Sequence, residues 1–241
     1  MTVPATFPKP GPWQQATVSE IRPETARAKT FRLSLSTPVD HLPGQHFVVR
    51  LRAPDGYQAS RSYSVASAPD GSGHIELTVE RLDEGEVSSF LHDVVVVGDQ
   101  LEVRGPIGGW FVWDGTTPAL LLGGGSGVVP LMSMLRWARR STPAPQVRLV
   151  VSVRSPGDLY YATELPGPEA TVVYTRSAPP GVTRAPGHLG SADLPAWATL
   201  PASTTAYVCG SSGFADAATD LLAEAGAPAT QIRVERFGPT S

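Results

Sequence analysis

Cysteine is almost absent from this sequence, and neither sign of charge dominates it. Cys209 is the one cysteine among 241 residues, and the formal net charge is −3. A conventional iron–sulfur cluster takes four cysteine thiolates, so we expect no such cluster and no other metal site. One cysteine also excludes a disulfide within the chain, which fits a reducing cytoplasm. The small negative charge gives no reason to expect nucleic acid or an anionic membrane as a partner.

Long hydrophobic runs are missing as well. No stretch approaches the roughly 18 apolar residues that a membrane-spanning helix needs. Prolines interrupt the first ten residues, so we expect neither a signal peptide nor a membrane anchor there, and residues 1–12 are predicted to form an extended arm. The composition, 41% hydrophobic and 17% charged, is ordinary for a globular protein, and the length suits two domains.

Residues 13–115 have the pattern of a series of short strands. Four segments alternate apolar and polar residues, as strands with one buried face do: 30–35, 46–51, 75–80 and 100–104. Turn signals rich in proline and glycine lie between them, and residues 88–93 have the pattern of a short helix. Short strands at this spacing predict a small antiparallel β-barrel.

Residues 116–241 have a different pattern. Apolar runs predict buried strands, which we place at 119–122, 147–153, 171–174, 205–208 and 232–237. Helical patterns cover residues 129–139 and the segment that follows the fourth of these strands, through Ala223. Strands that alternate with helices predict an α/β domain with a parallel sheet. We therefore expect two domains with a boundary near residues 114–118.

A short polar motif, Arg61-Ser62-Tyr63-Ser64, carries specific chemistry. An arginine pairs with phosphate, a tyrosine ring stacks on a planar group, and a serine hydroxyl donates a hydrogen bond to a ring nitrogen. Four such residues also occur together by chance, so the alternative is the solvated end of a strand. The segments that follow decide between the two.

Three of these segments appear in an order that resembles the ferredoxin–NADP reductase superfamily. They are the strand at residues 77–82, a Gly85-x-x-Ser88-x-x-Leu91 turn and a Gly105-Pro106-Ile107-Gly108 turn. The Gly85 turn opens the predicted short helix, whose free N–H groups favour a pyrophosphate. The resemblance covers about residues 13–238 and implies that the barrel binds FAD, with these contacts: Arg61, Tyr63, Ser64, Thr78, Val79, Gly85, Val87 and Ser88.

A glycine-rich turn follows the first strand of the second domain. Residues 123–127 read Gly-Gly-Gly-Ser-Gly, and Pro130 stands where the dinucleotide fingerprint Gly-x-Gly-x-x-Gly has its third glycine. Glycines let a pyrophosphate approach the backbone, although a tight turn without a ligand is the alternative. The resemblance implies NAD(P)H binding here, by Gly124, Gly125, Ser126 and Gly127, with the Ser126 hydroxyl near the nicotinamide.

Three residues at the ends of the next two strands are candidates for phosphate contacts. Arg154 ends the second strand, and Thr175-Arg176 ends the third, with Arg184 as a helper. NADP-dependent relatives place a Ser-Arg pair at this point, whereas NAD-specific ones more often place an acid there. We therefore expect NADPH rather than NADH, and the alternative is that these are ordinary surface arginines. Tyr160 and Glu164 match a family stretch only loosely.

Two segments near the C-terminus complete the predicted site. Cys209-Gly210 ends the fourth strand, and a buried structural cysteine is the alternative interpretation. The resemblance implies that Cys209 and Gly210 face the nicotinamide, and that Glu235 joins a proton path while Phe237 covers the flavin. With Ser64, which is placed to hydrogen-bond the flavin N5, Cys209 and Glu235 are the predicted catalytic residues.

The predicted function is that of a flavoprotein reductase. Hydride passes from NAD(P)H to FAD, and because we see no iron–sulfur domain in the chain, the electrons are expected to leave for a separate redox protein. One alternative is a flavin reductase that releases reduced flavin. Another is a redox-sensing or regulatory subunit on the same fold. The sequence does not indicate the acceptor or the oligomeric state.

Overall fold

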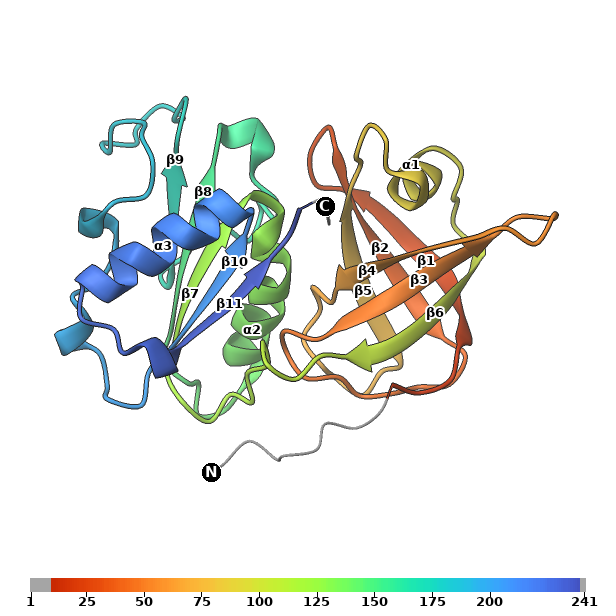
Figure 1. The fold of residues 1–241 in the computed structure, drawn as a ribbon, viewed down its shortest axis with the longest axis horizontal. Helices are drawn as coiled ribbons and strands as arrows, with labels where there is room; N and C mark the ends of the chain where they lie inside the picture. Colours follow the sequence, from red (N-terminus) through yellow and green to blue (C-terminus); the bar gives the residue numbers. More distant parts are fainter. Residues whose placement is uncertain (1–9, 239–241) are drawn as a thin grey trace.

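Two sheets side by side make up the protein (Figure 1). The structure, a computed structural model, describes residues 10–238, so most of the predicted arm at residues 1–12 lies outside the described residues. A six-stranded sheet with the order β4-β3-β6-β1-β2-β5 comes first, and a five-stranded sheet with the order β11-β10-β7-β8-β9 follows. Both predicted fold classes, an antiparallel barrel and then an α/β domain, are confirmed.

The first sheet closes into a barrel. All its strand pairs are antiparallel, and an isolated bridge between Val65 and Leu77 joins the end of β4 to β5, the two outermost strands. One short helix, α1, lies between β5 and β6. The bounds are β1 (Gln14–Pro23), β2 (Ala28–Leu35), β3 (His46–Arg52), β4 (Gln58–Ser64), β5 (His74–Glu80), α1 (Glu86–Asp93) and β6 (Gln100–Ile107).

Alternation explains why these segments form strands. In β2 and β5 every second side chain points into the barrel, where Phe31, Leu33, Ile75 and Val79 are almost fully buried. The burial of these side chains is the main term that stabilises the barrel, at about 25 cal/mol for each Å² of apolar surface. Helix α1 begins at Glu86, two residues earlier than predicted.

The predicted turn at residues 105–108 is wrong at its start, because strand β6 continues through it to Ile107. Gly105 lies under the ring of Phe47 in the neighbouring strand β3, and a Cβ atom on Gly105 would stand 2.6 Å from that ring. The glycine is therefore needed for close packing between two strands. A Gly-Pro pair usually signals a turn, which is why the sequence pattern misleads here.

The second sheet is parallel throughout, with helices on both faces. Figure 1 shows α2 between this sheet and the barrel and α3 on the opposite face. Each helix buries its apolar side against the sheet, which gives one buried cluster on each face. The bounds are β7 (Ala119–Gly124), α2 (Val128–Arg140), β8 (Val147–Val153), β9 (Ala170–Tyr174), β10 (Thr205–Gly210), α3 (Ser212–Glu224) and β11 (Ile232–Arg236).

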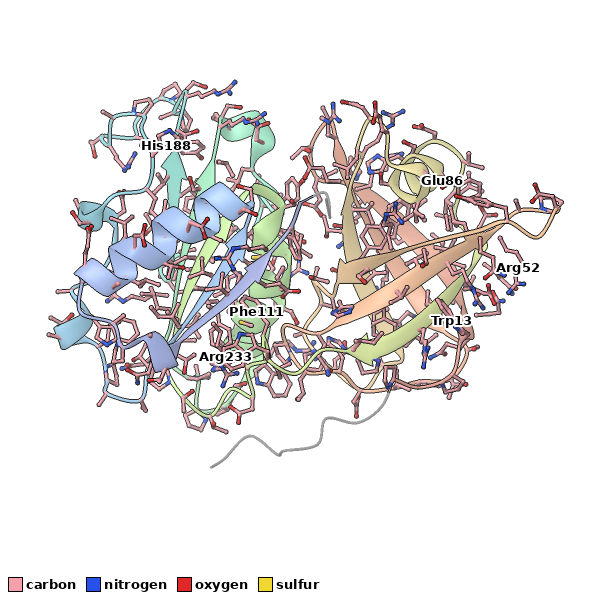
Figure 2. All side chains as sticks on the ribbon, in the orientation of Figure 1. Trp13, Arg52, Glu86, Phe111, His188 and Arg233 are labelled. Carbon is pink, nitrogen blue, oxygen red and sulfur yellow. The ribbon has the colours of Figure 1, made fainter. Side chains whose placement is uncertain are left out.

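The two domains share a packed interface. One buried cluster contains Ala28 and Ala66 of the barrel together with side chains of α2 and the parallel sheet. The segment between β6 and β7 also packs onto the sheet: Phe111 meets the Tyr207 ring edge-on at 5.4 Å, and the Tyr207 hydroxyl donates to the Val112 carbonyl at 3.0 Å. Phe111 and Arg233 are labelled at this junction in Figure 2. The predicted domain boundary falls within this segment.

Candidate functional site

Four strand ends form one edge of the parallel sheet. Strands β7, β8, β9 and β10 run in the same direction, so their carboxyl ends meet there, which is where ligands bind in open α/β sheets. Between β7 and α2 the chain makes a short 3₁₀ turn, Gly125–Gly127. Gly125 has φ +54°, a conformation that side chains disfavour, and a Cβ there would meet nothing within 4 Å. The turn is therefore open to a ligand.

Two other glycines of this turn are required by close packing. A Cβ on Gly127 would stand 2.1 Å from the carbonyl oxygen of Cys209, and one on Gly124 would stand 2.5 Å from the Phe214 ring. Because of these contacts, helix α2 begins directly beside the end of β10. No side chain caps α2, but the Val128 N–H donates to the Gly125 and Ser126 carbonyls and Pro130 has no N–H, so few N–H groups of the first turn are left for an anion.

Cys209 and Glu235 lie next to each other on β10 and β11, where they are register partners. Cys209 is fully buried, and burial together with the nearby carboxylate raises the pKa of its thiol. Burial also raises the pKa of Glu235 to about 7, and its Oε2 atom is buried without a hydrogen-bond partner among residues 10–238. Phe237 packs against the cluster that contains Cys209, so two predicted catalytic groups and the predicted covering ring lie together.

Arg154 and Arg176 also lie side by side. They follow β8 and β9, and the Arg176 N–H donates to the Arg154 carbonyl at 2.9 Å. Both side chains are exposed, and neither forms a salt bridge within the described residues. Thr175 is half-buried between β9 and Arg176. Two free guanidinium groups at adjacent strand ends suit a phosphate.

Arg184 does not join them. Its guanidinium pairs with Asp193 in a two-pronged salt bridge, with 2.8 Å between Nη2 and Oδ2, and it donates to the carbonyls of Gly187 and His188. These contacts hold together the loop that follows β9. The expectation that Arg184 folds back over a phosphate is therefore not supported, because Asp193, the first acidic residue after Arg176 in the sequence, already pairs with it.

On the barrel, β4 carries the polar motif. The Arg61 side chain is exposed, and within residues 10–238 its guanidinium bonds only to the Ser60 carbonyl. Tyr63 is half-buried, and burial raises the pKa of its hydroxyl. Ser64 ends the strand with a largely buried side chain, whose hydroxyl makes no hydrogen bond to another described residue. A guanidinium, a ring and a hydroxyl thus remain available on one strand.

The predicted pyrophosphate turn lies at the start of α1, which packs against β4 and β5. No side chain caps the helix. The Ser88 hydroxyl donates to the Gly85 carbonyl at 3.0 Å and accepts from the Leu82 N–H at 3.2 Å, and Val87 is in the barrel core. These side chains shape the turn, so contacts from it to a ligand would be made by backbone N–H groups. Glu86 is labelled beside α1, on the upper side of the barrel in Figure 2.

Two predicted contacts on β5 are occupied by the protein itself. Val79 points into the barrel core. The Thr78 hydroxyl lies 2.7 Å from that of Thr30 and 2.6 Å from that of Tyr161. Any contact of Val79 or Thr78 with a cofactor would therefore be made by the backbone, and the side-chain roles remain predictions without support.

The sequence did not point to Tyr161 as a functional residue. The loose family match rests on Tyr160, but Tyr161 contacts the barrel: its backbone N–H donates to Glu24, and its ring meets that of Tyr160 edge-on. Glu164 pairs with Arg136 of α2, so it stabilises the protein's own interface. The spacing to Glu164 is the local signal that was missed, because the tyrosine one residue closer to Glu164 than Tyr160 is Tyr161.

The residues present fit FAD and a nicotinamide dinucleotide. The barrel offers the uncapped start of α1 for a pyrophosphate, and the parallel-sheet domain offers the open glycine turn before α2. The barrel adds the Arg61 guanidinium, whose one bond within residues 10–238 is to the Ser60 carbonyl, and the Ser64 hydroxyl. The parallel sheet adds a buried carboxyl, Glu235, with one oxygen unpartnered in the same range. Within residues 10–238 no cluster of three metal-binding side chains occurs, and no helix in that range is long and apolar enough to cross a membrane.

Comparisons with protein families assign the same ligands to the two domains. Residues 15–112 match the model of the oxidoreductase FAD-binding domain, and residues 121–220 match that of the oxidoreductase NAD-binding domain. Together the two matches cover most of the chain, and their order is the order of the two sheets.

Relatives and solved structures extend the comparison. The chain is 32% identical to the glycine betaine monooxygenase reductase subunit of Chromohalobacter salexigens, over 90% of this chain, and 27% identical to the propane 2-monooxygenase reductase component of Rhodococcus jostii, over 91%. It spans 62% of the length of each.

Among solved structures, the FAD/NAD-binding domain of nitric oxide dioxygenase from Vibrio cholerae is 25% identical with a TM-score of 0.81, and the alignment covers 94% of this chain and 99% of that one. The shared order of the motifs, the two matching domain models and the agreement in fold lead to one conclusion. The chain belongs to the ferredoxin–NADP reductase superfamily of FAD- and NAD-binding oxidoreductases.

Proposed function

We propose that this protein is a flavoprotein reductase that takes hydride from NAD(P)H onto FAD and passes electrons to a separate redox protein. One observation carries the proposal. Ala66, two residues after Ser64 on the barrel, and Cys209, on the parallel sheet, belong to the same buried cluster, against which Phe237 packs. The end of the flavin motif and the end of the coenzyme-binding strand therefore both border one buried cluster between the domains.

FAD, when bound, supplies the acceptance of a hydride from the nicotinamide and the release of electrons one at a time. The chain's own residues orient the two ligands and supply protons. The Ser64 hydroxyl is a hydrogen-bond partner for the flavin, and buried Cys209 limits the space beside the nicotinamide. Glu235, with a pKa of about 7, can hold or give up a proton near neutral pH.

The partner we propose is an oxygenase component or a small electron carrier, because several relatives are reductase subunits or components of oxygenases. We place the protein in the cytoplasm, where its lone thiol stays reduced. The domain division is proposed as an arm at 1–12, an FAD domain at 13–115 and an NAD(P) domain at 116–241. The two alternative functions fit less well. A flavin reductase fits less well because the start of α1 suits a firmly bound pyrophosphate. A non-catalytic subunit fits less well because the Ser64 hydroxyl and one oxygen of Glu235 have no hydrogen-bond partner within the described residues.

Reduction of the bound flavin by coenzyme tests this function. In anaerobic stopped-flow mixing, the wild type should be bleached at 450 nm by NADPH or NADH and should then reduce cytochrome c. Ser64→Ala should slow bleaching about tenfold, because it removes a hydrogen bond of roughly 1.4 kcal/mol, and Cys209→Ala should slow it less, with flavin content unchanged in both. Wild-type bleaching rates in both variants would remove the two residues from the site, and no bleaching of the wild type would refute the function.

Arg61 should contribute to FAD retention. Its exposed guanidinium, which donates one hydrogen bond to the Ser60 carbonyl, has further N–H groups for a phosphate. Since the side chain is exposed we expect a contact worth roughly 1.5 kcal/mol, the low end for charged hydrogen bonds. Arg61→Ala should therefore weaken FAD binding about tenfold in equilibrium dialysis. Arg32 is a second exposed arginine of the barrel, so Arg32→Ala is the matched control and should leave the affinity for FAD unchanged. If flavin released from the denatured protein is FMN alone, the pyrophosphate role of the α1 turn is wrong.

A further inference from the structure

A closed ring of hydrogen bonds joins the two domains. The Tyr161 hydroxyl lies 2.6 Å from Thr78, and Thr78 lies 2.7 Å from Thr30. The Thr30 hydroxyl donates to one carboxylate oxygen of Glu24 at 2.7 Å, and the other oxygen of Glu24 accepts the Tyr161 backbone N–H at 2.9 Å. The ring thus starts and ends at Tyr161, a residue of the parallel-sheet domain, and its other members belong to the barrel.

The direction of the donors around the ring is fixed by chemistry. An ionised carboxylate only accepts, so Thr30 must donate to Glu24 and must accept from Thr78. Thr78 in turn accepts from Tyr161. Every hydroxyl proton points the same way around the ring, and each bond polarises the next one. Thr30, Thr78 and Tyr161 are all buried, so breaking one bond leaves a group that water cannot readily satisfy.

The backbone at Tyr161 is held as firmly as its side chain. Tyr161 has φ +56°, which is unfavourable for an aromatic residue and persists only where surrounding contacts impose it. The Arg136 guanidinium lies 4.8 Å from the centre of the Tyr161 ring and donates to the Ala66 carbonyl and to Glu76, both in the barrel. Tyr161 is therefore clamped from two sides.

This clamp is connected by a short segment to the coenzyme side. Tyr161 follows Arg154, at the end of β8, by seven positions, and the Ser155–Asp158 turn between them is closed by a hydrogen bond from the Ser155 hydroxyl to Asp158. Movement of Tyr161 relative to the barrel would therefore move the loop that carries Arg154. The same ring includes Thr78, on the strand that the family resemblance assigns to the flavin.

We propose that Tyr161 is a positioning residue, and that its hydrogen-bonded ring with Glu24, Thr30 and Thr78 sets the register between the coenzyme-binding sheet and the flavin barrel. The inference rests on the proposed function and adds a determinant of its geometry. Hydride transfer needs donor and acceptor atoms within about 3–3.5 Å, so a small loss of register costs rate even when both ligands are still bound.

Breaking the ring at two distant points tests the proposal. Tyr161→Phe and Thr30→Val each remove one hydroxyl and keep nearly the same volume. Each should slow the limiting rate of flavin reduction about tenfold, leave the apparent Kd of the coenzyme within about twofold and leave the flavin content unchanged. Because the ring acts as a unit, the double variant should be little slower than the single ones.

Tyr207→Phe is the matched control. It also removes one buried hydroxyl bond, to the Val112 carbonyl, and it lies outside the ring. Its reduction rate should stay within about twofold of the wild type. Ring variants that reduce as fast as this control would overturn the proposal, as would a double variant whose slowing is the product of the two single effects.

A second readout does not depend on catalysis. The Tyr161 N–H bonds to Glu24 across the interface, so its exchange with deuterium requires the domains to part. In flavin-free protein, a peptide covering residues 159–165 should exchange about tenfold faster in Thr30→Val than in the wild type, while β8 stays unchanged. Equal exchange would refute the ring. If the coenzyme fails to reduce the flavin of the wild type, the reductase function is refuted. The exchange result can still be interpreted in that case.

Discussion

Glu235→Gln should raise the free energy of unfolding by about 3 kcal/mol at pH 8 and leave it almost unchanged at pH 4. The folded protein holds the pKa of Glu235 at about 7, against 4.5 as its ordinary value, because the carboxyl is desolvated. Between these two values the folded state binds a proton that the unfolded state has lost. Stability from this group is therefore full below pH 4.5, is lost as pH rises towards 7 and changes no further above it.

Urea unfolding of the wild type and the variant at pH 4, 6 and 8 measures this difference. The gap between them should open mainly between pH 5 and pH 7. Glu224→Gln, an exposed glutamate at the end of α3, is the matched control and should shift the unfolding free energy by no more than about 0.5 kcal/mol at any of these pH values. A gap of the same size at pH 4 and pH 8 would mean that the effect comes from packing and not from the ionisation of Glu235.

Arg176→Ala should raise KM for NADPH about 10–100-fold and change KM for NADH by less than about twofold. The 2′-phosphate of NADPH is doubly charged near neutral pH and is best recognised by a guanidinium. Arg176 is exposed, unpaired within the described residues and adjacent to Arg154, so two such groups can converge on one phosphate. Losing one charged partner accounts for an effect of this size.

Steady-state kinetics with both coenzymes checks the prediction. Arg148→Ala provides the control, since Arg148 is also exposed and unpaired on the described chain but stands near the start of β8, at the opposite edge of the sheet. Its KM values should equal those of the wild type. If the wild type already prefers NADH, or if Arg176→Ala impairs both coenzymes alike, the assignment of the 2′-phosphate to Arg176 is wrong.

Local patterns predicted most of the fold because the physics behind them is local. Alternation in β2 and β5 follows from one buried face, and the glycine-rich turn after β7 follows from the geometry that a strand–helix junction needs. Gly105 shows the limit of this reasoning. Its role depends on the Phe47 ring of another strand, so its neighbours in sequence could not reveal it.

The hydrogen-bond partners of individual side chains were the hardest part of the site to predict. Thr78 lay in the right strand, but its hydroxyl is engaged by Thr30 and Tyr161, which are 48 and 83 positions away. Arg184 is predicted to help bind a phosphate, but it is held by Asp193, nine positions further along the chain. In both cases the residue type was informative about chemistry, and the long-range partner decided how that chemistry was used.

The separation of the two sheets has a consequence for how the chain folds. Every strand pairing of the barrel lies within residues 14–107, and every pairing of the parallel sheet lies within residues 119–236. The barrel can therefore close on the ribosome before the second sheet has been synthesised. Until Tyr161 arrives, Glu24 and Thr78 face water, and the hydroxyl ring becomes complete only when two finished surfaces dock. Docking of the preformed domains is thus the step that completes the ring.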